Sequence, residues 1–537
     1  MQNTINDVMR TTTLNYLGTI DPANPPEPSI IEGELLEELK TAFDLHNAVA
    51  DKGCKWKIPQ SLTFPQIALI VSTLYPVCRI ATGGDNTDTE YDLLAIYQTD
   101  GEDKGIYVTS DEVFRSLARS YNYQLTRREF DEFMIALRDM VPRKYRCTKP
   151  NLIAVNNGIF DYDTKQLLPF TPDLVFMAKS RIDYKDNPVN PVIHNPNDNT
   201  DWDVESWMNE LSDDPEIVNL LWQILGAIIR ANVPWGKSAW FYSESGNNGK
   251  GTLCELMREL CGNGTYASIS LSDMSKDFML EPLTRATAII VDENDVGTYI
   301  DKAANLKALV TGDTIQMNRK FKMPIAYQFK GFMVQCLNEM PRVKDKSDSF
   351  YRRQLFIPFT KCFTGAERKY IKQDYLHRPE VLQYVLHRVL HMDYYELDTP
   401  DVCIQALNEY KEFNDPVRQF MSEIMSQLVW DLAPFSFLYD LYRAWYTKNA
   451  GGRGEMKGLQ TFKKEFLTLL KEYPEWMCEK PDKVYKPGKK MDDAEPLIME
   501  YELKDWMNPM MMSSNDMNKR CHPLLKSGYQ GIVRVNP

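Results

Sequence analysis

The sequence predicts an α/β protein whose central segment, residues 236–365, forms a mainly parallel sheet flanked by helices. Two observations carry this prediction. Apolar, strand-like runs alternate with helical patterns along the segment, which is typical of parallel strands joined by crossover helices. The first run, residues 239–242, leads through a turn rich in glycine and asparagine into a helical pattern that opens near residue 252.

The composition is that of a globular protein of several domains. Of the 537 residues, 43% are hydrophobic and 26% are charged, and the formal net charge is −13. This charge argues against an overall basic surface for nucleic acid, although it leaves room for a local basic groove. No apolar run is long enough to cross a bilayer and no signal pattern opens the chain, so we expect a cytoplasmic protein without membrane partners. The ten cysteines include no CxxC pair, which favours reduced thiols.

Two regions are expected before the central segment. Residues 1–150 are predicted to be a mixed α/β domain of uncertain role, which begins with a flexible arm broken by prolines over residues 1–30. Its helices are expected at residues 111–120 and 126–140. Residues 151–235 are predicted to form a small β element, in which apolar and polar residues alternate, and then a helical domain.

Two regions are also expected after the central segment. The pattern of residues 366–430 is helical. Within residues 431–537, two amphipathic helices precede a basic, proline-containing stretch at residues 480–490. This order suits a small winged-helix-like domain, and a helical lid with a solvated charged loop is the alternative.

The turn after the first strand has the features of a phosphate-binding loop. Its backbone N–H groups can point at one anion, while a lysine and a helix N-terminus add positive potential. Two positions depart from the full P-loop pattern, since Glu244 replaces its first glycine and Gly251 replaces the Ser or Thr that binds Mg²⁺. A hairpin turn followed by a surface lysine is the alternative. The predicted nucleotide-binding residues are Ser245, Gly246, Asn247, Asn248, Gly249, Lys250, Gly251 and Thr252.

An acidic pair follows the next buried strand pattern, residues 286–291. We expect Asp292 to bind Mg²⁺, directly or through water, and Glu293 to polarise the water that attacks the terminal phosphate. A buried strand that ends in two solvated acids is common by itself. The phosphate loop that precedes this strand favours the catalytic interpretation.

Two more signals complete the predicted catalytic set. Asn338 ends the apolar run of residues 331–337, where its amide can hydrogen-bond the γ-phosphate or the attacking water. Arg352 and Arg353 follow, and arginine suits charge stabilisation at a transferring phosphoryl group, often from a neighbouring subunit. The alternatives are a turn asparagine and a salt-bridged arginine pair on a strand edge.

A basic cluster lies between the acidic pair and this asparagine. Arg319, Lys320 and Lys322 surround Phe321 in a predicted hairpin of an otherwise acidic chain. Cations around an aromatic ring can hold the phosphates of a single strand of nucleic acid. A solvated basic turn is the alternative.

The order of these motifs resembles that of the superfamily 3 helicases. The resemblance rests on GNNGKGT, AIIVDEN, LKALVTGD…RKFK, FMVQCLNEMP and FYRR. More narrowly, these motifs look like those in the helicase half of phage, plasmid and poxvirus primase–helicases. NLIAVNNGIFDYDTKQLLP is similar to the flanking domain of that group. The resemblance covers roughly residues 150–450, is less specific beyond the core, and hardly covers residues 1–140.

This resemblance implies an AAA+-type ATPase that uses ATP and Mg²⁺ and assembles as a homo-hexameric ring. Such a ring translocates on single-stranded DNA and unwinds forked duplex 3′ to 5′. Lys250 would contact the β- and γ-phosphates, and Thr252, or the backbone near Gly251, would help to hold Mg²⁺. The acidic motif falls on Asp292 and Glu293.

The resemblance also assigns the later motifs. Asn338 falls on the sensor, and Arg352 or Arg353 on the arginine finger. Lys320 and Lys322 fall in the DNA-contacting hairpin region.

Many proteins of this kind also carry a primase domain, which needs paired acids followed by a catalytic histidine. Asp85, Asp88 and Asp92 offer acids, but no histidine occurs between His46 and His194. We therefore expect no primase activity here, and a separate primase or polymerase as a possible partner. Residues 1–150 are then a regulatory or DNA-loading domain.

The leading hypothesis is thus an ATP-driven replicative DNA helicase of a virus, phage or mobile element, located in the host cytoplasm. Two alternatives share the same loop chemistry. One is an origin-binding initiator in which ATP only switches the state of assembly, and the other is an AAA+ remodeller of proteins.

Overall fold

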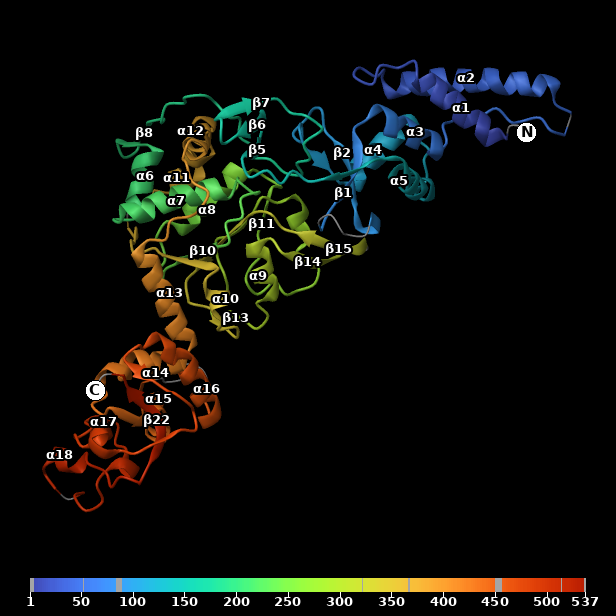
Figure 1. Ribbon diagram of the computed structural model, residues 1–537. Helices are drawn as coiled ribbons and strands as arrows, with labels where there is room; N and C mark the ends of the chain where they lie inside the picture. The colour runs from blue at the N-terminus through green and yellow to red at the C-terminus, as the bar shows by residue number, and fades with distance from the viewer. Residues whose placement is uncertain are drawn as a thin grey trace. The chain divides into compact units, whose positions relative to one another are not determined.

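The computed structural model describes residues 4–51, 53–83, 89–320, 322–365, 368–449, 456–512 and 514–535 (Figure 1). The chain divides into two compact units. The first comprises Met1–Glu339 and Arg353–Pro400, and the second comprises Met340–Arg352 and Asp401–Pro537. Among the described residues, no helix combines the length and the apolar character that crossing a bilayer requires.

The N-terminal part of the first unit combines five helices with a four-stranded sheet, and both contribute to one buried core. The helices are α1 (Ile5–Leu17), α2 (Pro28–Val49), α3 (Phe64–Leu74), α4 (Asp111–Tyr121) and α5 (Arg127–Met140). The sheet has the order β3-β2-β1-β4, with strands β1 (Val77–Ala81), β2 (Leu93–Tyr97), β3 (Tyr107–Val108) and β4 (Arg143–Tyr145). The two helices predicted at residues 111–120 and 126–140 are confirmed as α4 and α5.

The flexible arm predicted for residues 1–30 is wrong. Helix α1 begins with a capping box, in which the Thr4 hydroxyl accepts from the Asp7 N–H and the Asp7 carboxylate accepts from the Thr4 N–H. Tyr16 and Leu17 at its other end are buried in the core shared with α2 and α3. The prolines fall between the helices, and Pro28 takes the first position of α2, where a missing N–H costs nothing.

The middle of the first unit leads from a small sheet into buried helices. Strands β5 (Leu152–Val155), β6 (Gly158–Asp161) and β7 (Gln166–Leu168) form the antiparallel β element that the alternation predicted. A short pair, β8 (Ile193–Asn195) and β9 (Thr200–Trp202), precedes α6 (Val204–Glu210) and α7 (Pro215–Ala227). Helix α7 is buried along most of its length and packs against α12 (Pro379–Leu390), which follows the core.

The core is a five-stranded sheet with the order β11-β12-β16-β10-β18, in which all neighbours are parallel. Its strands are β10 (Ser238–Tyr242), β11 (Tyr266–Ala267), β12 (Ala288–Val291), β16 (Phe332–Leu337) and β18 (Gln354–Pro358). Helix α8 (Lys250–Cys261) follows β10. Since parallel strands end at one edge, the segments after β10, β12 and β16 leave the sheet side by side.

Several smaller elements accompany this sheet. Strand β13 (Tyr299–Ile300) and helix α9 (Ala304–Thr311) precede a hairpin of β14 (Thr314–Arg319) and β15 (Lys322–Gln328). Helix α11 (Lys369–Gln373) and the 3₁₀ turn η3 (Tyr375–His377) lie between β18 and α12 and pack against α8. The other 3₁₀ turns of this unit are η1 (Thr89–Tyr91) and η2 (Glu281–Arg285).

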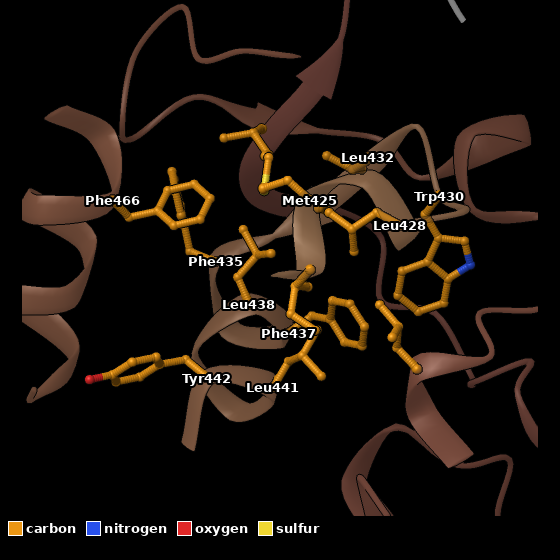
Figure 2. Close-up of a cluster of buried hydrophobic side chains, with 14 of the residues drawn as sticks. Met425, Leu428, Trp430, Leu432, Phe435, Phe437, Leu438, Leu441, Tyr442 and Phe466 are labelled. Carbon is orange, nitrogen blue, oxygen red and sulfur yellow. The ribbon is translucent and has the colours of Figure 1, made fainter. Parts of the chain in front are cut away.

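The second unit is a helical domain around a small sheet. Its helices are α10 (Asp348–Tyr351), α13 (Asp401–Asn414), α14 (Pro416–Ile424), α15 (Phe435–Asn449), α16 (Leu459–Leu469), α17 (Leu497–Glu500) and α18 (Met517–Arg520). Its strands are β17 (Arg342–Val343), β19 (Leu432–Pro434), β20 (Trp476–Met477), β21 (Val484–Tyr485) and β22 (Tyr529–Arg534). Figure 2 shows its core, where Trp430, Phe437 and Leu441 pack together.

The two amphipathic helices predicted in the C-terminal region are confirmed as α15 and α16. The basic stretch after them is held by the end of the chain, because β20 and β21 both pair with β22. One strand of this sheet, β19, precedes the two helices and the others follow them, and the winged-helix-like assignment stays a prediction. DNA contact by this domain stays a prediction.

Candidate functional site

The glycine-rich turn takes a conformation that few other sequences allow. Gly249 caps α8 with φ 86°, and Asn247 has φ 53°, so both lie in the left-handed region. A Cβ on Gly249 would also stand 2.7 Å from Cδ2 of Leu211, so another residue would have to displace that side chain as well as adopt the strained backbone. The Asn248 side chain donates to the Ser245 carbonyl and the Phe363 N–H donates to the Asn247 carbonyl, which closes the turn around the start of α8.

Lys250, the first residue of α8, is a buried cation without an acceptor. Its side chain is 5% exposed, and its Nζ makes no hydrogen bond to any described residue. Burial lowers the pKa of this ammonium group below its ordinary value. Burying an unpaired charge costs roughly several kcal/mol unless an opposite charge binds beside it. The loop is therefore suited to bind an anion.

Three motif ends meet at the same edge of the sheet. The order β12-β16-β10 places the acidic segment, the asparagine segment and the phosphate loop on adjacent strands. The Ser243 N–H donates to the Leu337 carbonyl over 3.1 Å, which joins the start of the loop to the residue before Asn338. The structure thus brings Lys250, Asp292 and Asn338 to one edge, as the sequence predicted.

Asp292 is tied to the helix of the phosphate loop. The Arg258 guanidinium of α8 pairs with its Oδ1 over 2.8 Å. Partial burial alone would raise the pKa of Asp292, but the hydrogen bond and charge of Arg258 outweigh burial, so the pKa is lowered. The carboxylate therefore stays ionised and offers oxygen ligands of the kind that Mg²⁺ prefers.

Glu293 and Asn338 are both exposed at this edge. Between them lies a residue that sequence reasoning missed. Asn294 is buried, donates to the Gln335 side chain and the Cys336 carbonyl, and accepts from the Leu271 N–H. It fixes the acidic segment to β16, and the asparagine after the acid pair was the only signal in the sequence that could have indicated it.

A cavity of about 380 Å³ opens beside the loop. It reaches Thr252, Asn247 and Gly249, and its other walls come from two distant segments. These walls combine aromatic and basic side chains, namely Trp207, Phe363, Arg368, Lys369 and Lys372. No motif pointed to these residues, because they reach the site only through the packing of α6 and α11 around the loop.

The two arginines fall in different compact units, and only Arg353 can be placed relative to the loop. The Arg353 carbonyl accepts from the N–H and the hydroxyl of Ser238, the first residue of β10. Arg353 therefore lies at the opposite edge of the sheet, about 13 Å away for a strand of this length. Arg352 caps the end of α10 and belongs to the second unit.

The predicted basic hairpin exists, but its cations already have partners. Arg319 lies opposite Lys322 and donates to the Met323 carbonyl, and burial lowers its pKa. Lys322 pairs with Asp111, at the start of α4, over 3.0 Å. The backbone N–H of Lys320 donates to Glu281 over 3.5 Å. Phe321, which these residues surround in the sequence, lies outside the described residues.

The acids considered for a primase site are also placed in part. Asp92 is buried and takes a two-point ion pair from Arg143, with distances of 2.9 and 3.0 Å. It therefore acts within the sheet of the N-terminal region and is not free to bind a metal. Asp85 and Asp88 lie outside the described residues.

Two family descriptions match parts of the chain. Residues 412–496 match the family described as Poxvirus D5 protein-like. Residues 241–353, which hold the loop and the strands after it, match a family of unknown function, DUF5906. The DUF5906 match lies mostly in the first compact unit but includes residues 340–352 of the second, where the Poxvirus D5 match also lies.

One protein of known sequence is similar to part of this chain. A provisionally named helicase of Acanthamoeba polyphaga mimivirus, L207/L206, is 25% identical over 222 residues, which cover 40% of this chain and 22% of that protein. The chain thus matches about a fifth of the length of this relative.

Two solved structures are distant in sequence. The apo structure of the NrS-1 C-terminal region (305–718) is 15% identical and covers 87% of this chain and 98% of its own, with a TM-score of 0.44. A structure of JCV helicase is 15% identical and covers 41% of this chain and 63% of its own, with a TM-score of 0.25. At TM-scores under 0.5, these likenesses do not establish a shared fold.

Proposed function

Because this chain is a member of the phage and poxvirus primase–helicase family, we propose that it is an ATP-driven DNA helicase of viral or phage replication. The observation that carries the proposal is the meeting of an unpaired buried lysine with an acidic and an asparagine strand end at one sheet edge. The strand order with the loop between β10 and α8 supports a P-loop core of the AAA+ type.

The residues at this edge fit a nucleotide triphosphate. Lys250 lacks an acceptor, which β- and γ-phosphates would supply. Gly249 and Asn247 give the turn its shape through their left-handed conformations. The adjacent cavity offers apolar walls, Trp207 and Phe363, suited to a base. Backbone N–H groups at the start of α8 complete the phosphate cradle.

Asp292 and Thr252 are the proposed ligands of Mg²⁺, which would neutralise charge on the phosphates when bound. Glu293 is exposed beside Asp292, where it can take a proton from the attacking water. Asn338, on the adjacent strand end, positions that water or the γ-phosphate. Gly251 has no side-chain oxygen, so Thr252, or the backbone near Gly251, takes over the metal role that the Ser or Thr of other P-loops performs.

Assembly into a ring of subunits would give the two arginines a catalytic role. Arg353 immediately precedes β18, the strand beside β10, and lies at the far edge of the sheet, so it cannot serve the loop of its own chain. In a homo-hexamer, Arg353 or Arg352 would act on the nucleotide of the neighbouring subunit. The β14–β15 hairpin and the winged-helix-like domain are the proposed contacts with single-stranded and forked DNA, and a separate primase or polymerase supplies synthesis.

The test compares steady-state ATP hydrolysis with and without single-stranded DNA, together with displacement of a strand from a fork. We expect severalfold stimulation by DNA and unwinding that depends on ATP. Hydrolysis that DNA leaves unchanged, in a protein that still binds ATP, would instead support the initiator or the remodeller. Negative-stain images with a nucleotide analogue and DNA would show whether the ring has six subunits.

A further inference from the structure

A second lysine approaches the phosphate loop from outside its motif. Lys372 lies on α11, which packs against α8. Its Nζ is 3.9 Å from the place where a Cβ on Gly251 would stand, and that distance is an ordinary contact. Because glycine has no side chain, the space beside the first turn of α8 is open to this ammonium group.

Lys372, like Lys369 three residues before it, forms no ion pair among the described residues, in contrast to three other basic residues close to it in the chain. Lys361 pairs with Asp213, Arg368 pairs with Glu210, and Arg378 pairs with Asp374. The Lys372 side chain is exposed at the cavity beside the loop instead. Burial raises the pKa of Asp292, and the charge of Lys372 adds to that of Arg258 in lowering it.

The backbone of Lys372 is fixed to the helix of the phosphate loop. The ring Nε2 of His377 lies 3.0 Å from the Lys372 carbonyl, and its Nδ1 lies 3.2 Å from Oε1 of Glu259 on α8. Ile371, the preceding residue, is buried. The lysine therefore projects from an anchored backbone toward Gly251, while its own side chain stays unpaired.

We propose that Lys372 is a second phosphate-binding cation of this site, which contacts the γ-phosphate end of ATP through the space left by Gly251. The inference rests on the proposed function. A P-loop with Ser or Thr at this place gains an oxygen ligand for the metal, whereas this chain has glycine there and a lysine opposite it. An ammonium group at the γ-phosphate end favours ATP over ADP, because ATP carries the additional phosphate charge there.

The experiment measures the affinities for a non-hydrolysable ATP analogue and for ADP in four forms of the full chain: wild type, Lys372→Ala, Lys372→Arg and Lys361→Ala. Loss of a charge-assisted contact costs about tenfold or more in affinity. We expect Lys372→Ala to lower the affinity for the ATP analogue by about this factor and the affinity for ADP much less. The kcat of ATP hydrolysis should fall as well. Lys372→Arg should restore most of the preference.

Lys361→Ala is the matched control, because it removes a lysine of the same connection whose charge is already paired. It should leave the ratio of the two affinities unchanged. An unchanged ratio and kcat in Lys372→Ala would overturn the inference. Lys250→Ala separates this failure from failure of the proposed function: if it abolishes binding while Lys372→Ala does not, only the role of Lys372 is lost. Matching thermal unfolding curves would show that each variant is folded.

Discussion

The phosphate loop and the β14–β15 hairpin both concentrate basic residues, but their charges end in opposite situations. Lys250 is buried without an acceptor, and Lys372 stands exposed without an acidic partner among the described residues. On the hairpin, Arg319 and Lys322 are bound to the Met323 carbonyl and to Asp111. A cation that the fold leaves unpaired indicates a ligand, whereas a paired cation must first exchange its partner.

The largest effect is expected where the unpaired charge is removed. Lys250→Ala should abolish measurable ATP binding, because truncating one partner of a buried charge pair costs about 3–5 kcal/mol, or more than a hundredfold in affinity. Equilibrium binding of a fluorescent ATP analogue measures the loss. Retained affinity would remove the difference between loop and hairpin on which the ATPase assignment depends. Lys165→Ala, which removes an ion-paired lysine of the β5–β7 region, is the control and should bind normally.

The next effect concerns chemistry without binding. Glu293→Gln should leave ATP affinity near that of the wild type and lower turnover by about a hundredfold or more, because general bases contribute 10²–10⁴-fold. Single-turnover hydrolysis and retention of bound ATP on a filter check the two parts separately. Unchanged turnover would assign the water-activating role elsewhere, and the exposed position of Glu293 would then be that of a solvated turn residue.

The order of strand, loop and helix could be predicted from the sequence because its causes are local. A continuous apolar run defines β10 and a period-3.6 pattern defines α8, and the left-handed position of Gly249 favours the residue that stands there. The parallel sheet then follows, and with it the meeting of Lys250, Asp292 and Asn338. Helix α1 was missed because the prolines after it drew more weight than the Thr4–Asp7 capping box before it.

The rest of the site has causes that are far apart in the chain. Trp207, Phe363 and Lys372 meet the loop only because α6 and α11 pack around it, and no spacing in the sequence records that contact. The pairing of Lys322 with Asp111 joins two regions that were predicted as separate domains. A charge cluster in a sequence shows which cations are present, but only the fold shows which of them are already neutralised.

A smaller effect is expected at the buried amide that supports the catalytic edge. Asn294→Ala leaves the Leu271 N–H, the Gln335 amide and the Cys336 carbonyl without their partner, which should lower the free energy of unfolding by about 2 kcal/mol. Urea unfolding followed by tryptophan fluorescence measures this. Asn338→Ala, an exposed asparagine on the neighbouring strand end, should change stability by less than about 0.5 kcal/mol. Equal effects of the two substitutions would show that Asn294 has no special structural role.

The smallest effect tests whether the hairpin is restrained by its acidic partner. Asp111→Asn releases Lys322 from a half-exposed ion pair worth about 0.5 kcal/mol, so affinity for single-stranded DNA should rise about twofold. Glu112→Gln changes the net charge equally at the next position and should have less effect.

The salt dependence of DNA binding shows whether Lys322 itself contacts the DNA, because each phosphate contact contributes about 0.7 to the slope of log affinity against log salt. Lys322→Ala should reduce this slope by about 0.7, and the double variant with Asp111→Asn should match Lys322→Ala alone. If Asp111→Asn raises the affinity for DNA even when Lys322 is replaced by Ala, Asp111 repels DNA directly. The hairpin would then not be the element that binds the strand.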